Sequence, residues 1–246
     1  MESNREVEED ESPGSGPAAS YAGRHALRDQ DALWAEFLAM ALTVVESLAK
    51  SVEVLCEQRL DAVSEVKNME RDSDQAEVRI EQQCLRIFAL FEPVASDLRR
   101  MATILKINRD WERIADLAVR IAERARKLAR IPDGVPVPDR LKSMARDALD
   151  QVHSSYEALA TRDAIRARAV IDGDRVINKH YQQLRRELKE SLRRQADRLD
   201  EWLRLMSIAR NLERIGDHAV GIAQTIVFME EGIIIRHKNR LKMPDE

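Results

Sequence analysis

Aromatic residues make up only 4% of this chain of 246 residues, which also contains only 8 glycines, 7 prolines and 2 cysteines. Glycine and proline interrupt helices more strongly than other residues, and here they cluster instead of spreading along the chain. The long stretches between them are rich in Ala, Leu, Arg and Glu, with apolar residues at helical spacing. This profile is typical of an all-α protein built from long helices. Cys56 and Cys84 lack the spacing of a metal site, so we expect two free thiols in a reducing cytosol.

Other absences narrow the classes of function. The formal net charge is −4, so the chain has no global basic field to hold nucleic acid. No uncharged stretch approaches the roughly 20 residues that span a bilayer. No charged segment followed by an apolar one opens the chain, as a secretion signal would. We therefore expect a cytoplasmic protein that neither binds nucleic acid nor inserts into a membrane.

Helix breakers divide the chain into two halves. Residues 1–22 are acidic and then rich in Pro, Gly and Ser, and we expect a disordered tail, because they bury too little to offset the entropy of ordering. The segment IPDGVPVPDR at 131–140 predicts a linker over 132–138. Each side of the linker holds enough helical periodicity for one three-helix bundle, over 23–131 and 139–235, with a C-terminal tail over 236–246.

Apolar periodicity predicts the individual helices of each bundle. Asp172-Gly173 marks the expected passage between the fourth and fifth helices, and Gly232 is expected just after the end of the sixth. The expected helices lie at about 27–59, 61–90, 94–130, 139–171, 174–195 and 199–231.

A fifteen-residue motif occurs twice in this chain. NRDWERIADLAVRIA at 108–122 and ARNLERIGDHAVGIA at 209–223 share nine of their fifteen positions. The copies fall on the third expected helix of each half, so the whole three-helix unit is duplicated. A weaker similarity relates VKNMERDSD at 66–74 to VIDGDRVIN at 170–178. It pairs Glu70 and Asp74 with Asp174 and Asn178. A shift of two residues would bring in Asp72 or Asp172 instead.

Each copy of the repeated motif places two carboxylates on one stripe of its helix. Glu112 and Asp116 are four residues apart, as are Glu213 and Asp217, and each pair faces away from the apolar side of its helix. Such a like-charge pair disfavours a helix by about 0.2–0.5 kcal/mol. Together with acids from the neighbouring helix, the stripe would suit a hard cation such as Mg, Mn, Ca or oxidised Fe. An ordinary solvated face is the alternative that spacing alone leaves open.

No catalytic motif accompanies the stripes. The chain has no glycine-rich phosphate loop, nucleophile elbow or HExxH motif. His218 follows Glu213 by five residues and turns toward the apolar side, so we expect a packed or hydrogen-bonded histidine instead of a metal ligand. The sequence therefore shows no catalytic constellation beside the stripes.

Three longer segments resemble the PhoU family of phosphate-transport accessory regulators over roughly residues 25–240. They are the two extended copies, INRDWERIADLAVRIAE and ARNLERIGDHAVGIAQ, the passage EPVASDLRRMATILKINRDWERIAD and the ending FMEEGIIIRHKN. The resemblance implies two tandem three-helix bundles in a cytoplasmic, often dimeric, non-enzymatic protein that reaches the inner membrane only through partners. It implies a negative regulator of phosphate uptake and of the phosphate-starvation response, which links the ATPase subunit of the phosphate ABC transporter to a sensor histidine kinase.

The resemblance also implies metal sites on the carboxylate stripes. The metal would be Fe, Mn, Mg or Zn. The implied ligands are Glu70, Asp74, Glu112 and Asp116 in the first half, and Asp174, Asn178, Glu213 and Asp217 in the second.

This sequence departs from the family pattern at several places. Ala115 stands where the family usually has Gly, and Arg120 and Gly221 stand where it often has Asn. Gln224 and Asn178 replace acids. Two other functions remain open: a metal-binding helical protein with hydrolase or metal-storage chemistry, and an adaptor for a different transporter.

Overall fold

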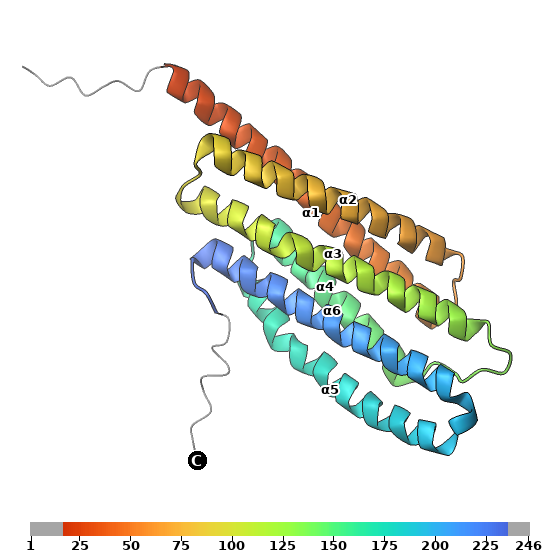
Figure 1. Ribbon diagram of the computed structural model, residues 1–246. Helices are drawn as coiled ribbons and strands as arrows, with labels where there is room; N and C mark the ends of the chain where they lie inside the picture. Colours follow the sequence, from red (N-terminus) through yellow and green to blue (C-terminus); the bar gives the residue numbers. More distant parts are fainter. Residues whose placement is uncertain (1–16, 236–246) are drawn as a thin grey trace, which may run out of the picture.

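Residues 17–235 of the chain, and the side chains of 27–235, are described by a computed structural model (Figure 1). Within these residues helices are the only regular secondary structure, which confirms the all-α fold. Residues 1–16 of the predicted acidic tail and the predicted C-terminal tail at 236–246 lie outside the described residues. The helices are α1 (Pro17–Glu57), α2 (Ala62–Phe91), α3 (Ala95–Ala129), α4 (Asp139–Thr161), α5 (Ala164–Arg194) and α6 (Leu199–Glu231), with a short 3-10 helix, η1 (Ala196–Arg198), before α6.

The helices form two three-helix bundles side by side (Figure 1). In the first, α1, α2 and α3 pack against one another, and in the second α4, α5 and α6 do the same. The bundles meet where α3 packs on α6 and α1 on α4. The repeated motif therefore lies on α3 and α6, which pack on each other between the halves.

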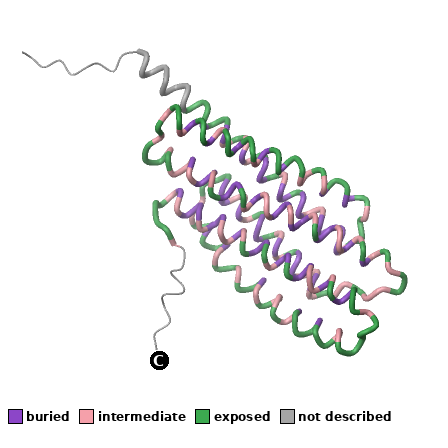
Figure 2. The backbone as a smooth tube through the Cα atoms, in the orientation of Figure 1, coloured by how far each residue is buried: buried purple, intermediate pink, exposed green. Residues whose placement is uncertain are grey.

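Buried residues recur along all six helices (Figure 2). On α3 the fully buried residues recur at three- and four-residue steps, as an amphipathic helix requires. They include Ile104, Ile107, Trp111, Ile114, Ala118 and Ile121.

Helix α1 is the most apolar of the six. By length and composition its segment Leu27–Glu57 could cross a bilayer, which the sequence analysis did not anticipate. In the structure this segment is a core helix, because Leu33, Phe37, Val44 and Leu48 have no exposed surface. Its apolar side chains are satisfied by packing against α2, α3 and α4.

Two helix ends differ from the prediction. Helix α1 begins at Pro17, inside the segment predicted to be a disordered tail over 1–22. Proline is tolerated in the first turn of a helix, where its missing N–H has no partner to lose. The two alanines after it favour the helix and extend it from the packed region.

The boundary between α4 and α5 lies about ten residues earlier than Asp172-Gly173. Arg162 adopts a left-handed conformation with φ of 56°, and Asp163 caps α5 by accepting hydrogen bonds from the Ile165 and Arg166 N–H groups at 2.9 Å each. A side-chain cap of this kind fixes a helix start more strongly than a single internal glycine opposes a helix. Gly173 consequently lies within α5.

The other predicted breakers act as expected. Gly232 ends α6 with φ of 71°, and its N–H donates to the Phe228 carbonyl at 2.9 Å. The linker over 132–138 passes close to α6, where Glu201 Oε2 accepts a hydrogen bond from the Val135 N–H at 2.6 Å. A Cβ at Gly134 would lie 3.2 Å from the same oxygen, so glycine lets the linker approach this buried carboxylate.

Candidate functional site: two carboxylate stripes

The first carboxylate stripe (Glu70, Asp74, Glu112 and Asp116) is built from facing turns of α2 and α3. Glu112 and Asp116 keep 17% and 23% of their side-chain surface exposed, so they sit at the edge of the bundle and not in its interior. Trp111, Ile114 and Ala115, which alternate with them, are fully buried and fix the helix rotation. The amphipathic pattern of α3 therefore holds both acids toward α2.

Burial and mutual repulsion raise the pKa of three of these acids. For Glu70 and Asp74 the largest cause is the loss of hydration, followed by the negative charges of neighbours that include Asp116. The pKa of Glu112 is also raised first by burial, and the Asp116 and Asp74 charges add to it while Arg113 opposes it. The stripe is thus a concentration of negative charge that the fold brings together from two helices.

Two arginines partly neutralise the first stripe. Arg113 Nη1 lies 3.2 Å and Arg120 Nη2 3.3 Å from the same oxygen of Asp116, Oδ2. Arg113 Nε is also 3.4 Å from Glu112 Oε2. Arg120 thus occupies a carboxylate oxygen that a cation would need.

The second carboxylate stripe (Asp174, Asn178, Glu213 and Asp217) has the same layout on α5 and α6. Burial is the main cause that raises the pKa of Asp174, Glu213 and Asp217, and the Asp217 charge adds to it for the first two. Hydrogen bonds from the amides of Gln151 and Asn178 lower the pKa of Asp174 in opposition. The amide of Asn178 donates to Asp174 Oδ2 at 2.5 Å.

Burial also favours one register between the two halves. When Glu70 is matched with Asp174 and Asp74 with Asn178, the core positions of α2 and α5 fall on one another. The matched buried pairs are Val63 with Ala167, Val66 with Val170, Ser73 with Ile177, Ile80 with Leu184 and Cys84 with Leu188. Asp72 and Asp172, the acids of the alternative register, are both exposed on the outer surface.

The donor chemistry of the stripes fits a hard cation, although their side chains are not preorganised around one. Within residues 27–235, no group of three or more His, Cys, Asp and Glu side chains is arranged to hold a metal ion. The donors are carboxylate oxygens and one amide, the ligands of Mg, Mn and Ca, whereas structural zinc sites are dominated by Cys and His. Binding would draw these side chains together, and a cation would relieve the repulsion between neighbouring carboxylates such as Asp74 and Asp116.

A histidine contact joins α6 to α3 beside the two stripes. His218, next to Asp217 on α6, has Nδ1 2.9 Å from Oδ1 of Asp110 on α3. This confirms a hydrogen-bonded histidine, but its partner lies in the other bundle and no local pattern indicates it. Gln151 and Glu201 were missed for the same reason, since each acts on a residue distant in sequence.

Comparison with known proteins identifies the family to which this fold belongs. A model of the PhoU domain family matches this chain twice, at residues 37–125 and 141–226, once in each bundle. The chain belongs to the PhoU family. The sequence resemblance is confirmed by relatives that match along most of their length.

Two such relatives are phosphate-specific transport system accessory protein PhoU homologues. The one from Deinococcus radiodurans is 35% identical over 195 residues, which cover 79% of this chain and 91% of the relative. The one from Aquifex aeolicus is 34% identical over 204 residues, which cover 83% and 92%.

Two solved structures share the fold. The crystal structure of PhoU from Pseudomonas aeruginosa superposes with a TM-score of 0.79 at 28% identity and covers 84% of this chain and 99% of that one. The phosphate transport system regulatory protein PhoU from Streptococcus pneumoniae gives a TM-score of 0.76 at 23% identity, covering 85% and 99%, and supports the fold alone.

Proposed function

We propose that this chain is a cytoplasmic regulator of phosphate homeostasis. It restrains phosphate uptake and the phosphate-starvation response by bridging the ATPase subunit of the phosphate ABC transporter and a sensor histidine kinase. The observation that carries the proposal is the PhoU domain in each of two duplicated bundles, with relatives named as accessory proteins of phosphate-specific transport.

The architecture suits an adaptor. Helices α2 and α5 have 30 and 31 residues and lie on the outside of their bundles, each contacting the other two helices of its own bundle. At about 1.5 Å per residue each presents a face of roughly 45 Å, long enough for an extended protein interface. A bridging protein needs two such faces, and a duplicated bundle supplies them.

Gene deletion tests the regulatory role. A strain without the gene should express a phosphate-starvation reporter, such as secreted phosphatase, in high-phosphate medium, and a plasmid copy should restore repression. Unchanged repression in the deletion strain would overturn the proposal. Affinity capture from membranes at high and low phosphate should recover the ATPase and kinase, and recovery of another transporter instead would favour the alternative adaptor role.

We propose further that each carboxylate stripe binds a hard cation, Mg, Mn or Fe, with Zn less suited to the donors. The raised pKa values of Glu112 and Glu213, which are both partly buried, favour this over a plain solvated face, because solvated acids have little reason to shift. Arg120 must leave Asp116 before the first stripe can bind metal, whereas Gly221 occupies the matching place in the second half and offers no such competitor.

Elemental analysis of untagged protein tests the metal. E112Q/D116N and E213Q/D217N should each lower the metal content, and D72N/D172N is the matched control because its acids are exposed and off the stripes. Metal content that is unaffected by the stripe variants, or no metal above the buffer level, would contradict the proposal. Phosphatase assays on the metal-loaded protein address hydrolase chemistry, and turnover that disappears with the stripe variants would favour it over the adaptor.

We propose that the protein acts as a homodimer. Light scattering on the full chain measures this directly, and a monomer mass at micromolar concentration would contradict it.

A further inference from the structure

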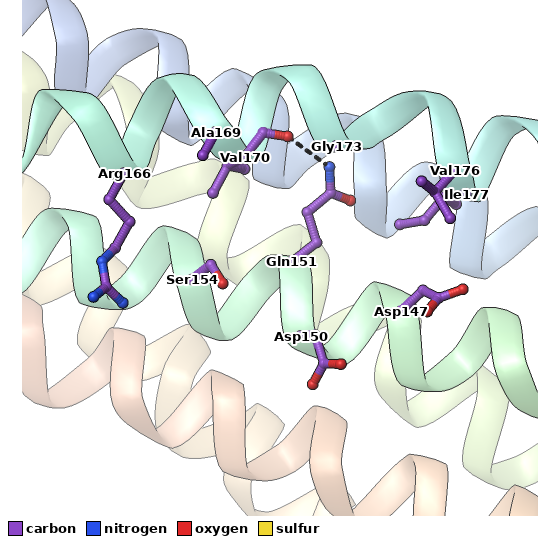
Figure 3. Close-up of a pocket in the computed structure, with 10 residues that line it drawn as sticks. All are labelled: Asp147, Asp150, Gln151, Ser154, Arg166, Ala169, Val170, Gly173, Val176 and Ile177. Atoms are coloured by element: carbon purple, nitrogen blue, oxygen red, sulfur yellow. Dashed lines mark hydrogen bonds between the residues drawn. The ribbon is translucent and has the colours of Figure 1, made fainter.

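A groove lies between α4 and α5 of the second bundle (Figure 3). It encloses about 300 Å³. Asp147, Asp150 and Ser154 line it from α4, and Arg166, Ala169, Gly173 and Val176 line it from α5. At its base the amide of Gln151 donates to the Val170 carbonyl at 3.2 Å, as Figure 3 shows.

The duplicated halves reveal what opened this groove. The register that matches Val66 with Val170 also matches α1 with α4, because buried Ser51 falls on buried Ser155 and buried Leu48 on buried Val152. Each groove residue therefore has an identifiable counterpart in the first bundle.

Large side chains occupy these positions in the first bundle. Lys50 and Glu65 take the places of Ser154 and Ala169, and Lys50 Nζ lies 2.6 Å from Glu65 Oε2 across α1 and α2. Half-buried Met69 takes the place of Gly173. Three long side chains in one half thus correspond to three small ones in the other, which opens this part of the α4–α5 groove. Between α1 and α2 the first bundle has a smaller groove, of about 200 Å³.

The outer stripe of α5 has changed from polar to apolar. Ile165 and Val176 are 82% and 50% exposed, and they stand where the first bundle has Asp61 and Asp72. With Ala169 and Gly173 between them, they form a stripe of about three helical turns, roughly 16 Å long. A Cβ at Gly173 would meet nothing within 4 Å, so the groove is open at its centre.

The opposite wall is acidic. Asp147 and Asp150 lie on α4, one turn apart. Asp147 Oδ2 is 3.4 Å from Nδ1 of His180, which lies one turn beyond Val176 on α5. An occupant would therefore meet apolar surface along the middle of α5 and negative charge from Asp147 and Asp150 on α4, with the Arg166–Glu157 ion pair at one end of the groove.

We propose that this groove receives an amphipathic helix of a protein partner, with its apolar stripe on α5 and a Lys or Arg at the edge facing Asp147 and Asp150. Small residues let another helix approach closely, and apolar residues at i, i+3 or i+4 and i+7 would match the stripe of three turns. Charge complementarity with α4 orients the helix and excludes acidic partners. The inference rests on the proposed adaptor role only in requiring a protein partner.

Photo-crosslinking with the full chain in its own host tests the groove. A benzophenone amino acid placed at Val176 should crosslink to another protein. The same group at Asp72 is the matched control, because Asp72 holds the corresponding place in the first bundle and lines its smaller groove, which lacks the apolar stripe. Peptide mapping should place the crosslink in a helix with the stated apolar spacing and basic edge. A crosslink no stronger than that at Asp72, one to a second copy or to this chain's own tail, or one to a segment without this pattern would each overturn the proposal.

Filling the groove supplies the second arm. S154K/A169E/G173M copies the first bundle and should weaken the crosslink about tenfold or more, as expected when a central contact is lost. K50S/E65A/M69G makes the reverse exchange in the first bundle and should leave the crosslink at Val176 intact. If the filled variant does not fold, A169E alone places a charge on the exposed stripe and should give the same loss. Undiminished crosslinking in a folded, filled variant would overturn the proposal.

The identity of the crosslinked protein separates this inference from the proposed function. A helix of the transporter ATPase or the kinase would support both. A helix of another protein with the stated pattern would support the groove and count against the phosphate adaptor role.

Discussion

Replacing Gly216 by alanine tests how the second bundle packs around its copy of the repeated motif. A Cβ at Gly216 would lie 3.1 Å from Gln151 Oε1 and 3.3 Å from Ile177 Cδ1, both closer than ordinary contact. In the first half the matching residue is Ala115, and Ser47 and Ser73 stand at the places of Gln151 and Ile177. The half with alanine at this position thus has small residues facing it, and the half with glycine has large ones.

Two opposing effects set the magnitude. Glycine to alanine inside a helix contributes about 1 kcal/mol of stability through helix propensity. Overpacking a filled core costs about 1–3 kcal/mol, and Gln151 cannot move freely because it is buried and its amide holds the Val170 carbonyl. We therefore expect G216A to lower the free energy of unfolding by about 1 kcal/mol.

A double-mutant cycle isolates the contact. Q151S copies Ser47 and removes the nearest atom, so G216A in that background should be neutral or stabilising, which gives a coupling energy of at least about 1 kcal/mol. Urea unfolding of the four proteins measures it. A115G, in the other bundle, should be destabilising with no coupling to Q151S. If G216A alone stabilises the protein by the full propensity difference and is additive with Q151S, the packing argument is refuted.

Three further predictions concern capping, the linker and pH. D163A removes the side-chain cap of α5 and should cost about 1 kcal/mol in urea unfolding, whereas D163N should cost less. E201A leaves the Val135 N–H without its acceptor, should destabilise the fold by about 1–2 kcal/mol and should speed proteolysis in 131–138, and E201Q should keep most of the protection. The folded-state pKa values of Glu112 and Asp217 are raised, so protonation stabilises the fold below their unfolded pKa of about 4 and this contribution is lost as pH rises through the folded values. E112Q and D217N should therefore be more stable than the parent at pH 7 but not near pH 4, and a gain independent of pH would contradict this reasoning.

The sequence predicts the architecture because periodicity and duplication are local signals. The apolar spacing on α3 and α6 places Glu112 and Glu213 on the bundle edge before any coordinates are known. The α4–α5 boundary is less predictable, since Asp172-Gly173 and the Asp163 cap compete as breakers. The cap prevails because it supplies an acceptor to two backbone N–H groups, whereas a helix tolerates one glycine at about 1 kcal/mol.

The interhelical contacts of the site are not predictable in this way. The bond from His218 to Asp110 and the approach of Gln151 to Gly216 each join residues more than sixty positions apart. Neither residue of such a pair has an unusual neighbour in sequence. Their partners are fixed only when the helices pack, so the sequence can indicate the stripes but not the side chains that connect or neutralise them.

The differences between the halves point to a division of roles. Natural duplication begins with two equal bundles, and the core positions here still correspond, as Ser51 and Ser155 do. The outer positions have separated: the first half keeps Arg120 on its stripe and an ion pair across its groove, while the second has Gly221 and an open apolar groove. Because these outer residues are not part of the core, they can change with little effect on the stability of the fold. Replacing only the outer residues of the second half by their first-half counterparts should therefore keep the fold and lose both the stripe without a competing arginine and the apolar groove.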